Sequence, residues 1–319
     1  MMLMMLLILI GLVIYILWDN NRIVVRKENI VLDHLPEQLQ GFSILQISDL
    51  HEKEFGKNNK RLIEQINSLE YDAIVFTGDM LDGAESDNYE YFYSLIEGIH
   101  NKELALFVYG NSDPPSYQTA PVFEKSEFIR GMEKRGVQFL ETIETLEVDK
   151  AKIHFINFEW AIITNPEYIG RVNGTYRPSY HRHDKYLDYQ GGLWDKTKNI
   201  EDIVSSDVTV ALNHFPIAEP RVDYIQSDPN TEWRNFDLIL SGHYHGGQIR
   251  LPFVGALYIP EPWYEPNSFY PPQDRVKGLW KYKTTFHYVS AGLGSSDAIS
   301  FLEFRLFNPP EMNLLKLTR

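Results

Sequence analysis

The sequence contains no cysteine in its 319 residues. Metal sites built from soft thiolate ligands are therefore excluded. The absence does not indicate a cellular compartment, because a chain without thiols is compatible with oxidising and with reducing surroundings. Any metal site in this chain must be made from carboxylate, imidazole and amide groups.

Positive charge is also scarce, since 30 Lys and Arg residues face 44 Asp and Glu residues and leave a net charge of −14. A nucleic acid is not expected as a partner, because the electrostatic attraction that drives such binding would be repulsive overall. A phosphate group can still be bound where metal ions create local positive charge.

Long hydrophobic runs are absent except for one at the N-terminus, from Met1 to Trp18. As a helix this run would be about 27 Å long, which is close to the thickness of the hydrocarbon core of a bilayer. It has neither the basic start nor the small-residue cleavage site of a removable signal peptide. We predict a transmembrane anchor over residues 1–20 and one domain over residues 21–319, with a buried core helix as the alternative to the anchor.

The orientation of this anchor is predicted from basic residues. None precedes the hydrophobic run, whereas Arg22, Arg26 and Lys27 follow it. The positive-inside rule then predicts a single-pass protein of the cell membrane with its domain in the cytoplasm. An exported domain is the alternative.

The first half of the domain alternates between apolar runs and segments with helical spacing. This alternation predicts parallel strands covered by helices. The predicted strands are Arg22–Leu32, Phe42–Ser48, Asp72–Thr77 and Leu104–Tyr109, and the predicted helices are Asn58–Leu69 and Tyr89–Ile99.

The second half predicts a helix at Phe123–Arg135 and a second sheet. The strands of this sheet are predicted at Gln138–Leu140, Thr145–Val148, Lys152–Phe158, Asp207–Leu212, Phe236–Ser241, Thr284–Ser290 and Ile299–Phe307, with Leu314–Leu317 behind. Residues 164–200 have no clean periodicity, and we interpret them as an insertion over the site. The loop at 258–280 is rich in proline and aromatic residues, which is typical of an ordered surface loop or of a lipid-facing or substrate-contacting lip.

Short polar clusters follow five of the apolar runs. They are Asp49-Leu-His51, Gly78-Asp79, Gly110-Asn111, Asn213-His214 and Gly242-His-Tyr-His245. Open α/β sheets bind ligands outside the carboxyl ends of their strands, so these clusters are expected to meet in one site. Their donor atoms suit Mn, Fe, Co, Ni or Zn, and they are too numerous for one tetrahedral ion. We therefore predict two divalent ions, most simply Mn, held by Asp49, His51, Asp79, Asn111, His214, His243 and His245, with Asp79 as the bridge.

In this order the five clusters resemble the calcineurin-like metallophosphoesterases. The resemblance implies a four-layer αββα sandwich of two mixed sheets flanked by helices. It also implies that Asp49, His51, Asp79 and His245 hold one metal and that Asp79, Asn111, His214 and His243 hold the other. The segments Ser43–His51 and Gly246–Pro252 and the tail from Asn308 are similar to the bacterial membrane-associated branch. For that branch the expected substrates are phosphodiesters and lipid-linked pyrophosphates.

One position departs from the family pattern. The asparagine is usually followed by a histidine and an acidic residue, whereas this chain has Ser112 and Asp113. A serine cannot donate a proton near pH 7, and a positioned acid is worth roughly 10²–10⁴-fold in rate. Relatives that hydrolyse UDP-2,3-diacylglucosamine also lack the histidine, but they have arginine there. We expect Asp79, Asn111, Ser112 and Asp113 to be catalytic, and we expect good leaving groups to be favoured.

Three further residues are predicted to contact the substrate. His181 or His183 from the insertion is a candidate replacement for the missing histidine, and Arg250 is a candidate ligand of a substrate phosphate.

The sequence thus predicts a membrane-anchored, monomeric phosphohydrolase. A metal-bridging hydroxide would cleave a phosphodiester or pyrophosphate bond in a phosphorylated small molecule or a lipid-linked substrate, such as a nucleotide-activated lipid. The alternative is a metal-binding scaffold of the same fold with little or no turnover, acting through a protein partner.

Overall fold

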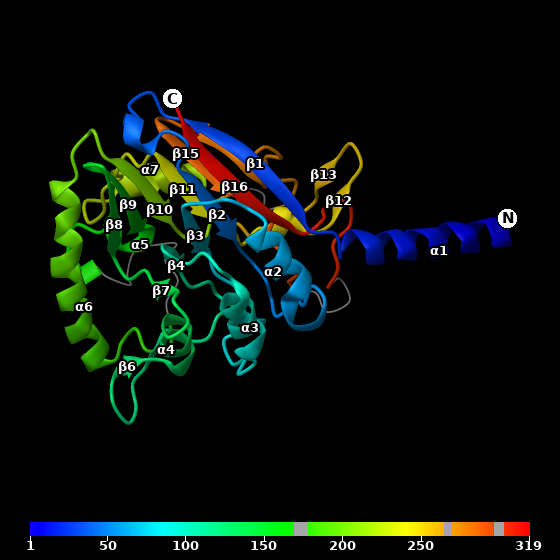
Figure 1. Cartoon of the computed structure of the whole chain (residues 1–319), viewed down its shortest axis with the longest axis horizontal. Coiled ribbons are helices and arrows are strands. Elements are labelled where there is room, and N and C mark those ends of the chain that lie inside the picture. The colour runs from blue at the N-terminus through cyan, green and yellow to red at the C-terminus, as the bar shows by residue number, and fades with distance from the viewer. Residues whose placement is uncertain (169–177, 265–268, 297–302) are drawn as a thin grey trace.

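The computed structural model describes residues 1–168, 178–264, 269–296 and 303–319. Two six-stranded sheets lie face to face in the described chain (Figure 1). The first has the order β1 (Val24–Val31), β16 (Glu311–Thr318), β2 (Ser43–Ile47), β3 (Ala73–Phe76), β4 (Ala105–Phe107) and β7 (Gln138–Phe139). The second has the order β14 (Gly278–Tyr282), β15 (Thr285–Val289), β11 (Leu238–Ser241), β10 (Val208–Leu212), β9 (Ala151–Asn157) and β8 (Ile143–Val148).

Both sheets are mixed. Strands β2, β3, β4 and β7 are parallel to one another, as are β9, β10, β11 and β15. The antiparallel pairs are β16 with β2, β14 with β15 and β8 with β9. Because the parallel strands end at the same edge of each sheet, the loops that follow them converge.

Side chains of the central strands alternate between two cores. Val75 of β3 points into the core between the sheets, whereas Ile74 and Phe76 pack against the helices of the first sheet. In the second sheet, Leu238 and Leu240 of β11 face the core between the sheets and Ile239 faces the opposite side. This alternation with a period of two fits strands buried on both faces.

Helices cover the outer faces. The helices α2 (Lys60–Asn67), α3 (Glu90–Gly98) and α4 (Glu127–Glu133) pack on the first sheet. The helices α5 (Phe158–Ala161) and α7 (Glu219–Ser227) pack on the second, and α6 (Asp184–Thr197) lies at the end of the molecule opposite α1 (Figure 1). The predicted fold class, two mixed sheets flanked by helices, is confirmed.

Short elements complete the described chain. The 3₁₀ turns are η1 (Glu37–Leu39), η2 (Lys57–Asn59), η3 (Pro166–Tyr168), η4 (Lys198–Asp202) and η5 (His245–Gly247). Two small hairpins pair β5 (Tyr117–Gln118) with β6 (Glu124–Lys125) and β12 (Arg250–Leu251) with β13 (Gly255–Ala256).

The helix α1 (Met2–Asp19) extends away from the sheets (Figure 1). It is long and apolar enough to cross a membrane, and only 6% of it is buried against the rest of the chain. The alternative of a buried core helix is therefore wrong.

Several predicted elements differ in the structure. Gln138–Leu140 and Leu314–Leu317 were predicted in or behind the second sheet, but they correspond to β7 and β16 of the first sheet. The segment predicted as a strand at Ile299–Phe307 falls partly outside the described residues, and residues 303–307 form no strand apart from a single bridge between Leu306 and Ile249. The predicted insertion at 164–200 contains α6, and the predicted helix at Phe123–Arg135 is shortened to α4 because β6 occupies its first residues.

Candidate metal centre

The predicted ligands lie directly after the parallel strands. Asp49 and His51 follow β2, Asp79 follows β3, and His214 follows β10. His243 and His245 follow β11. Five of these six residues have positive φ angles, namely Asp49 (49°), His51 (47°), Asp79 (55°), His243 (67°) and His245 (48°). Side chains rarely adopt this left-handed backbone, and such strain is found where a site requires a fixed geometry.

Four side chains form a first group. Donor atoms of Asp49, His51, Asp79 and His245 all lie within 4.8 Å of one another, and all four residues are buried. His51 Nε2 lies 3.5 Å from Asp79 Oδ2, and His245 Nε2 lies 3.5 Å from Asp49 Oδ1. Within the described part of the chain, the buried atoms His51 Nε2 and His245 Nδ1 have no hydrogen-bond partner. A buried polar atom without a partner is costly, so a ligand such as a metal ion fits this group.

A second group shares Asp79 with the first. Donor atoms of Asp79, His214 and His243 lie within 4.8 Å of one another. His214 Nε2 is 3.2 Å from Asp79 Oδ2 and 3.1 Å from His243 Nδ1. The last predicted ligand, Asn111, follows β4 and is exposed, with its amide nitrogen donating to Ser112 Oγ at 3.3 Å. The two groups fit a pair of ions bridged by Asp79.

Two of the imidazoles are oriented by their second ring nitrogen. His51 Nδ1 lies 3.0 Å from Asp82 Oδ1, and His214 Nδ1 lies 2.8 Å from the carbonyl oxygen of Thr77. Such contacts fix the tautomer and leave Nε2 for a metal. Sequence reasoning missed Asp82, because no spacing marks it apart from its place three residues after Asp79.

Charge also favours a cation at this site. Burial opposes ionisation of Asp79, but the neighbouring His214 holds the pKa of that carboxyl well below its usual range. Burial disfavours a charged imidazole at His214 as well, yet the carboxylate of Asp79 raises the pKa of His214 to about 9. Burial and the charge on His214 lower the pKa of His243 to about 3. A neutral imidazole at His243 provides the lone pair that a metal requires.

Asp113 lies beneath the site and holds its loops. Its Oδ2 accepts the backbone N–H of Asp79 and of Gly110, each at 2.8 Å. Its Oδ1 accepts the N–H of Met80 at 2.8 Å and of Leu81 at 3.3 Å. The carboxylate thus joins the loop after β3 to the loop after β4, which fits a positioning residue.

Ser112 is directed at the shared carboxylate. Its backbone N–H donates to Asp79 Oδ1 at 2.7 Å, and its hydroxyl donates to Asp79 Oδ2 at 3.2 Å. The side chain at this position therefore contacts the predicted bridging ligand.

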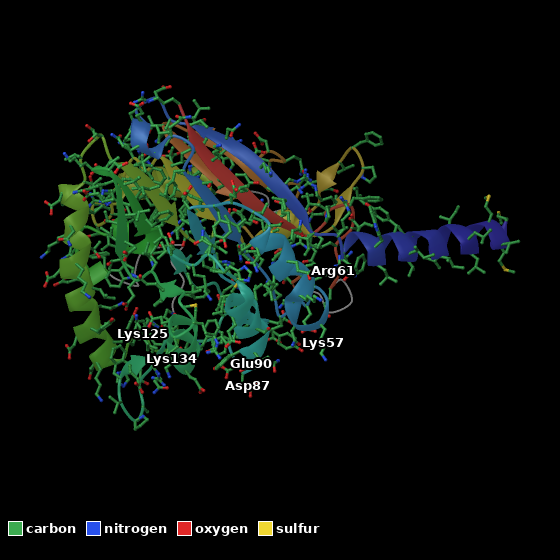
Figure 2. All side chains as sticks on the ribbon, in the orientation of Figure 1. Lys57, Arg61, Asp87, Glu90, Lys125 and Lys134 are labelled. Atoms are coloured by element: carbon green, nitrogen blue, oxygen red, sulfur yellow. The ribbon has the colours of Figure 1, made fainter. Side chains whose placement is uncertain are left out.

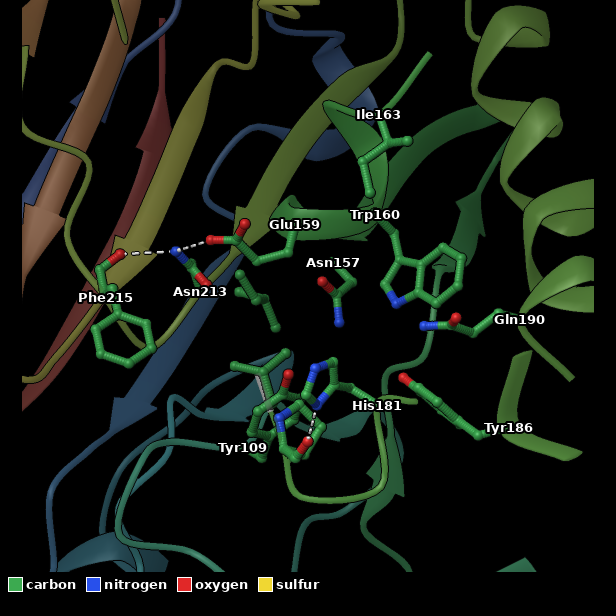
Figure 3. Close-up of a pocket in the computed structure, with 13 residues that line it drawn as sticks. Tyr109, Asn157, Glu159, Trp160, Ile163, His181, Tyr186, Gln190, Asn213 and Phe215 are labelled. Carbon is green, nitrogen blue, oxygen red and sulfur yellow. Dashed lines mark hydrogen bonds between the residues drawn. The ribbon is translucent and has the colours of Figure 1, made fainter. Parts of the chain in front are cut away.

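A pocket lies next to the loops that follow β4 and β10, and Figure 3 shows the residues that line it. It has a volume of about 60 Å³, and Tyr109, Asn213 and Phe215 in its wall are neighbours in sequence of Gly110 and His214. The ring of Phe215 is centred 4.6 Å from that of His243. Aromatic, amide and aliphatic side chains line most of the remainder, among them Asn157, Trp160 and Leu212, and Glu159 adds a carboxylate.

Only one of the three predicted substrate contacts lines this pocket. His181 lines the pocket, and its Nδ1 lies 2.7 Å from the carbonyl oxygen of Pro178. His183 precedes α6 and is not among the lining residues. Arg250 Nη1 donates to the carbonyl oxygen of Gly246 at 2.9 Å, which ties β12 to η5.

Comparison with known proteins identifies the family. Residues 42–247 match the calcineurin-like phosphoesterase model, and the chain belongs to this family. It is 26% identical over 292 residues to the metallophosphoesterase YkuE of Bacillus subtilis, covering 89% of this chain and 81% of that protein. It is 25% identical over 304 residues to the UDP-2,3-diacylglucosamine pyrophosphatase LpxG of Chlamydia trachomatis, covering 87% and 84%. The solved phosphopantetheinyl hydrolase of Mycobacterium tuberculosis aligns with a TM-score of 0.42 at 13% identity, over 79% of this chain and 89% of that one.

The family match confirms the resemblance predicted from the five clusters. Together with its metallophosphoesterase relatives, it establishes this protein as a metal-dependent phosphoesterase.

Proposed function

We propose that this protein hydrolyses a phosphodiester or pyrophosphate bond in a lipid-linked substrate at a membrane surface. The observation that carries the proposal is the buried carboxylate of Asp79, which belongs to both ligand groups. The apolar helix α1 supports the membrane location. The relative LpxG, a UDP-2,3-diacylglucosamine pyrophosphatase, supports a pyrophosphate in a nucleotide-activated lipid as the substrate class.

The residues that would hold the metals are those of the two groups, with Asn111 joining the second group as the family resemblance implies. Two divalent ions held there, most simply Mn with Fe, Zn, Co or Ni as alternatives, would supply an activated water and would neutralise charge on the phosphoryl oxygens. The protein's own contribution is to fix the donors: Asp82 and the carbonyl of Thr77 orient the imidazoles of His51 and His214, and Asp113 holds the backbone of the loops.

The leaving group is expected to depart with little protonation. Ser112 Oγ lies 3.2 Å from Asp79 Oδ2, and a hydroxyl supplies no acidic proton near pH 7. A pyrophosphate leaves without that help more readily than an alkoxide. His181, which lines the pocket together with Asn213 and Phe215, is the proposed contact to the substrate.

The leaving-group preference is tested by Ser112→His. We expect this variant to increase turnover of an alkyl phosphodiester by about tenfold or more and to change turnover of an aryl phosphodiester little, because only the poor leaving group requires an acid. Equal effects on both substrates would contradict the assignment.

The activity itself is tested with the full-length protein in detergent. Hydrolysis of bis-p-nitrophenyl phosphate with added Mn²⁺ is expected for the wild type and for Asp87→Asn, an exposed carboxylate outside the site. Asp79→Asn is expected to lose both turnover and bound metal, the latter measured by elemental analysis. Metal bound in the wild type without metal-dependent turnover would favour the scaffold alternative.

The basic residues that follow α1 support a domain on the cytoplasmic side of the membrane, with an exported domain as the alternative. Protease accessibility of the domain in intact cells tests this orientation.

A further inference from the structure

The hairpin of β12 and β13 ends in an exposed apolar turn. Leu251 is 39% exposed, Val254 is 47% exposed, and Phe253 at the tip is fully exposed. Phe253 also has a φ angle of 65°. A bulky side chain is disfavoured in this left-handed region, so neither packing nor turn geometry explains a phenylalanine here.

This turn is continuous with the base of α1. Phe307, which is 43% exposed, lines a hollow of about 420 Å³ together with Leu251, Phe253 and Val254. Its ring is centred 5.2 Å from that of Tyr15 in α1. Figure 1 shows the hairpin on the side of the domain from which α1 extends.

Hydrogen bonds attach the end of α1 to the domain. Asn20 Nδ2 donates to the carbonyl oxygen of Arg305 at 2.7 Å, and the N–H of Arg305 donates to Asn20 Oδ1 at 2.7 Å. Lys53 Nζ donates to the carbonyl oxygen of Asn20 at 2.6 Å. A membrane that holds α1 therefore meets one particular side of the domain.

Basic side chains lie on the same side. Arg61 Nη2 donates to the carbonyl oxygen of Asn21 at 2.8 Å, immediately after α1. Figure 2 shows Lys57 and Arg61 on the part of the domain nearest α1. Positive charge here suits anionic lipid headgroups, although the whole chain has a net charge of −14.

We propose that Leu251, Phe253, Val254 and Phe307 form a second membrane contact, which inserts into the headgroup boundary of the bilayer crossed by α1. The contact rests on the membrane location in the proposed function and goes beyond it by fixing the orientation of the domain. The hairpin follows η5 directly, and Arg250 ties the two together through the carbonyl of Gly246. Insertion of the hairpin therefore holds the loop of His245 close to the plane of the headgroups, where a lipid-linked phosphate lies.

The test uses the absence of cysteine, which allows one dye to be placed at each chosen position. Full-length Phe253→Cys, Leu9→Cys and Val122→Cys are each labelled with an environment-sensitive dye. Each is then reconstituted into vesicles of phosphatidylethanolamine and phosphatidylglycerol that contain a quencher carried on lipids both at the headgroup and along the acyl chain. Val122 is the matched control, because it is 60% exposed in the turn between β5 and β6, on a part of the domain remote from α1 (Figure 1).

We expect the quencher to reduce dye fluorescence at positions 253 and 9 several-fold more than at position 122. Quenching at position 9 but not above the control at position 253 overturns the second contact. Quenching at neither position overturns the membrane premise itself. Energy transfer between dyes at position 253 that increases with protein density, without lipid quenching, assigns the turn to an interface between two copies instead.

Activity provides an independent measurement. Phe253→Ser is expected to lower kcat/KM on a vesicle-embedded lipid pyrophosphate by about tenfold, because it removes a large apolar side chain from the lipid contact. Hydrolysis of soluble bis-p-nitrophenyl phosphate is expected to stay unchanged. An equal loss on both substrates contradicts the proposal. A protein without any turnover contradicts the proposed function, but the quenching experiment still tests the membrane contact because it does not depend on activity.

Discussion

At the scale of single residues, Asp113 connects the two loops that carry Asp79 and Asn111. Asp113→Asn replaces one accepting oxygen by an amide nitrogen that faces backbone N–H groups. We expect the free energy of unfolding to fall by about 1–3 kcal/mol and the affinity for metal to fall with it. Thermal unfolding with and without Mn²⁺ measures both, with Asp87→Asn as the control. A variant as stable and as metal-loaded as the wild type would show that the backbone holds the loops without this carboxylate.

A second residue, His287 of β15, predicts how stability depends on pH away from the metal centre. Its ring stacks on that of Trp280, with centroids 4.0 Å apart, and burial lowers its pKa to about 3. The unfolded chain therefore binds a proton below its ordinary pKa near 6.5, while the folded chain does not until pH 3. This contribution to stability is complete above pH 6.5 and is lost as the pH falls, with a slope of up to about 1.4 kcal/mol per pH unit.

Urea unfolding of the wild type and of His287→Phe between pH 7 and pH 4 checks this prediction. The variant is expected to lose less stability over that interval, since it lacks the titrating group. Parallel pH dependences for the two proteins would assign the acid sensitivity to other groups.

At the scale of elements, the loops after the strands approach one another so closely that side chains are excluded. A Cβ atom on Gly110 would lie 2.2 Å from Asp79 Oδ1, and one on Gly242 would lie 2.3 Å from Asp49 Oδ2. Gly110→Ala and Gly242→Ala are therefore expected to abolish metal binding, measured by elemental analysis of the purified proteins.

The control for these two variants is a glycine in a helix. Among the described residues, a Cβ on Gly192 in α6 meets nothing within 4 Å, so Gly192→Ala is expected to stabilise the protein by about 0.5–1 kcal/mol and to keep the metals. Normal metal content in Gly110→Ala would mean that the loops can separate at little cost.

The strands and most of the candidate ligand groups could be predicted because each depends on residues that are close together in the sequence. Apolar runs identify β2, β3, β10 and β11, and the polar residue after each run is a candidate ligand. The pairing of strands depends on residues far apart in sequence, which is why the sequence patterns do not show that β7 and β16 belong to the first sheet. Helix α6 is not predicted because two of its four buried residues, Gln190 and Thr197, are polar. The buried apolar residues Tyr186 and Leu193 alone do not give a recognisable helical period.

The contacts around the site could not be predicted for the same reason. Asp82 and Arg305 become neighbours of His51 and His245 only after folding, and neither lies in a recognisable spacing. Arg305 Nη1 reaches the carbonyl oxygen of His245 at 3.5 Å, from 60 residues away in sequence. Whether the assembled residues bind metal and substrate as predicted stays a prediction for the experiments above.

At the scale of the whole molecule, metal is expected to stabilise the fold, because it would bind clustered carboxylates and imidazoles that are buried in the folded protein. Binding to the folded state alone contributes about 2.7 kcal/mol when the free ion is at 100 times its Kd. Chelation is therefore expected to lower the Tm by several degrees. Calorimetry of the wild type with and without chelator measures the change, and Asp79→Asn should show almost none. A chelator effect of equal size in Asp79→Asn would mean that the ions act elsewhere.

The position of β16 also bears on how the protein is made. This strand lies between β1 and β2, and Val24 of β1 pairs with Glu311 across nearly the whole length of the chain. The first sheet cannot close until residues 311–318 have been synthesised. If α1 enters the membrane first, the emerging chain remains tethered there with open strand edges, which are prone to aggregation. The first sheet is then completed only when β16 inserts into the gap between β1 and β2, two strands that were made much earlier.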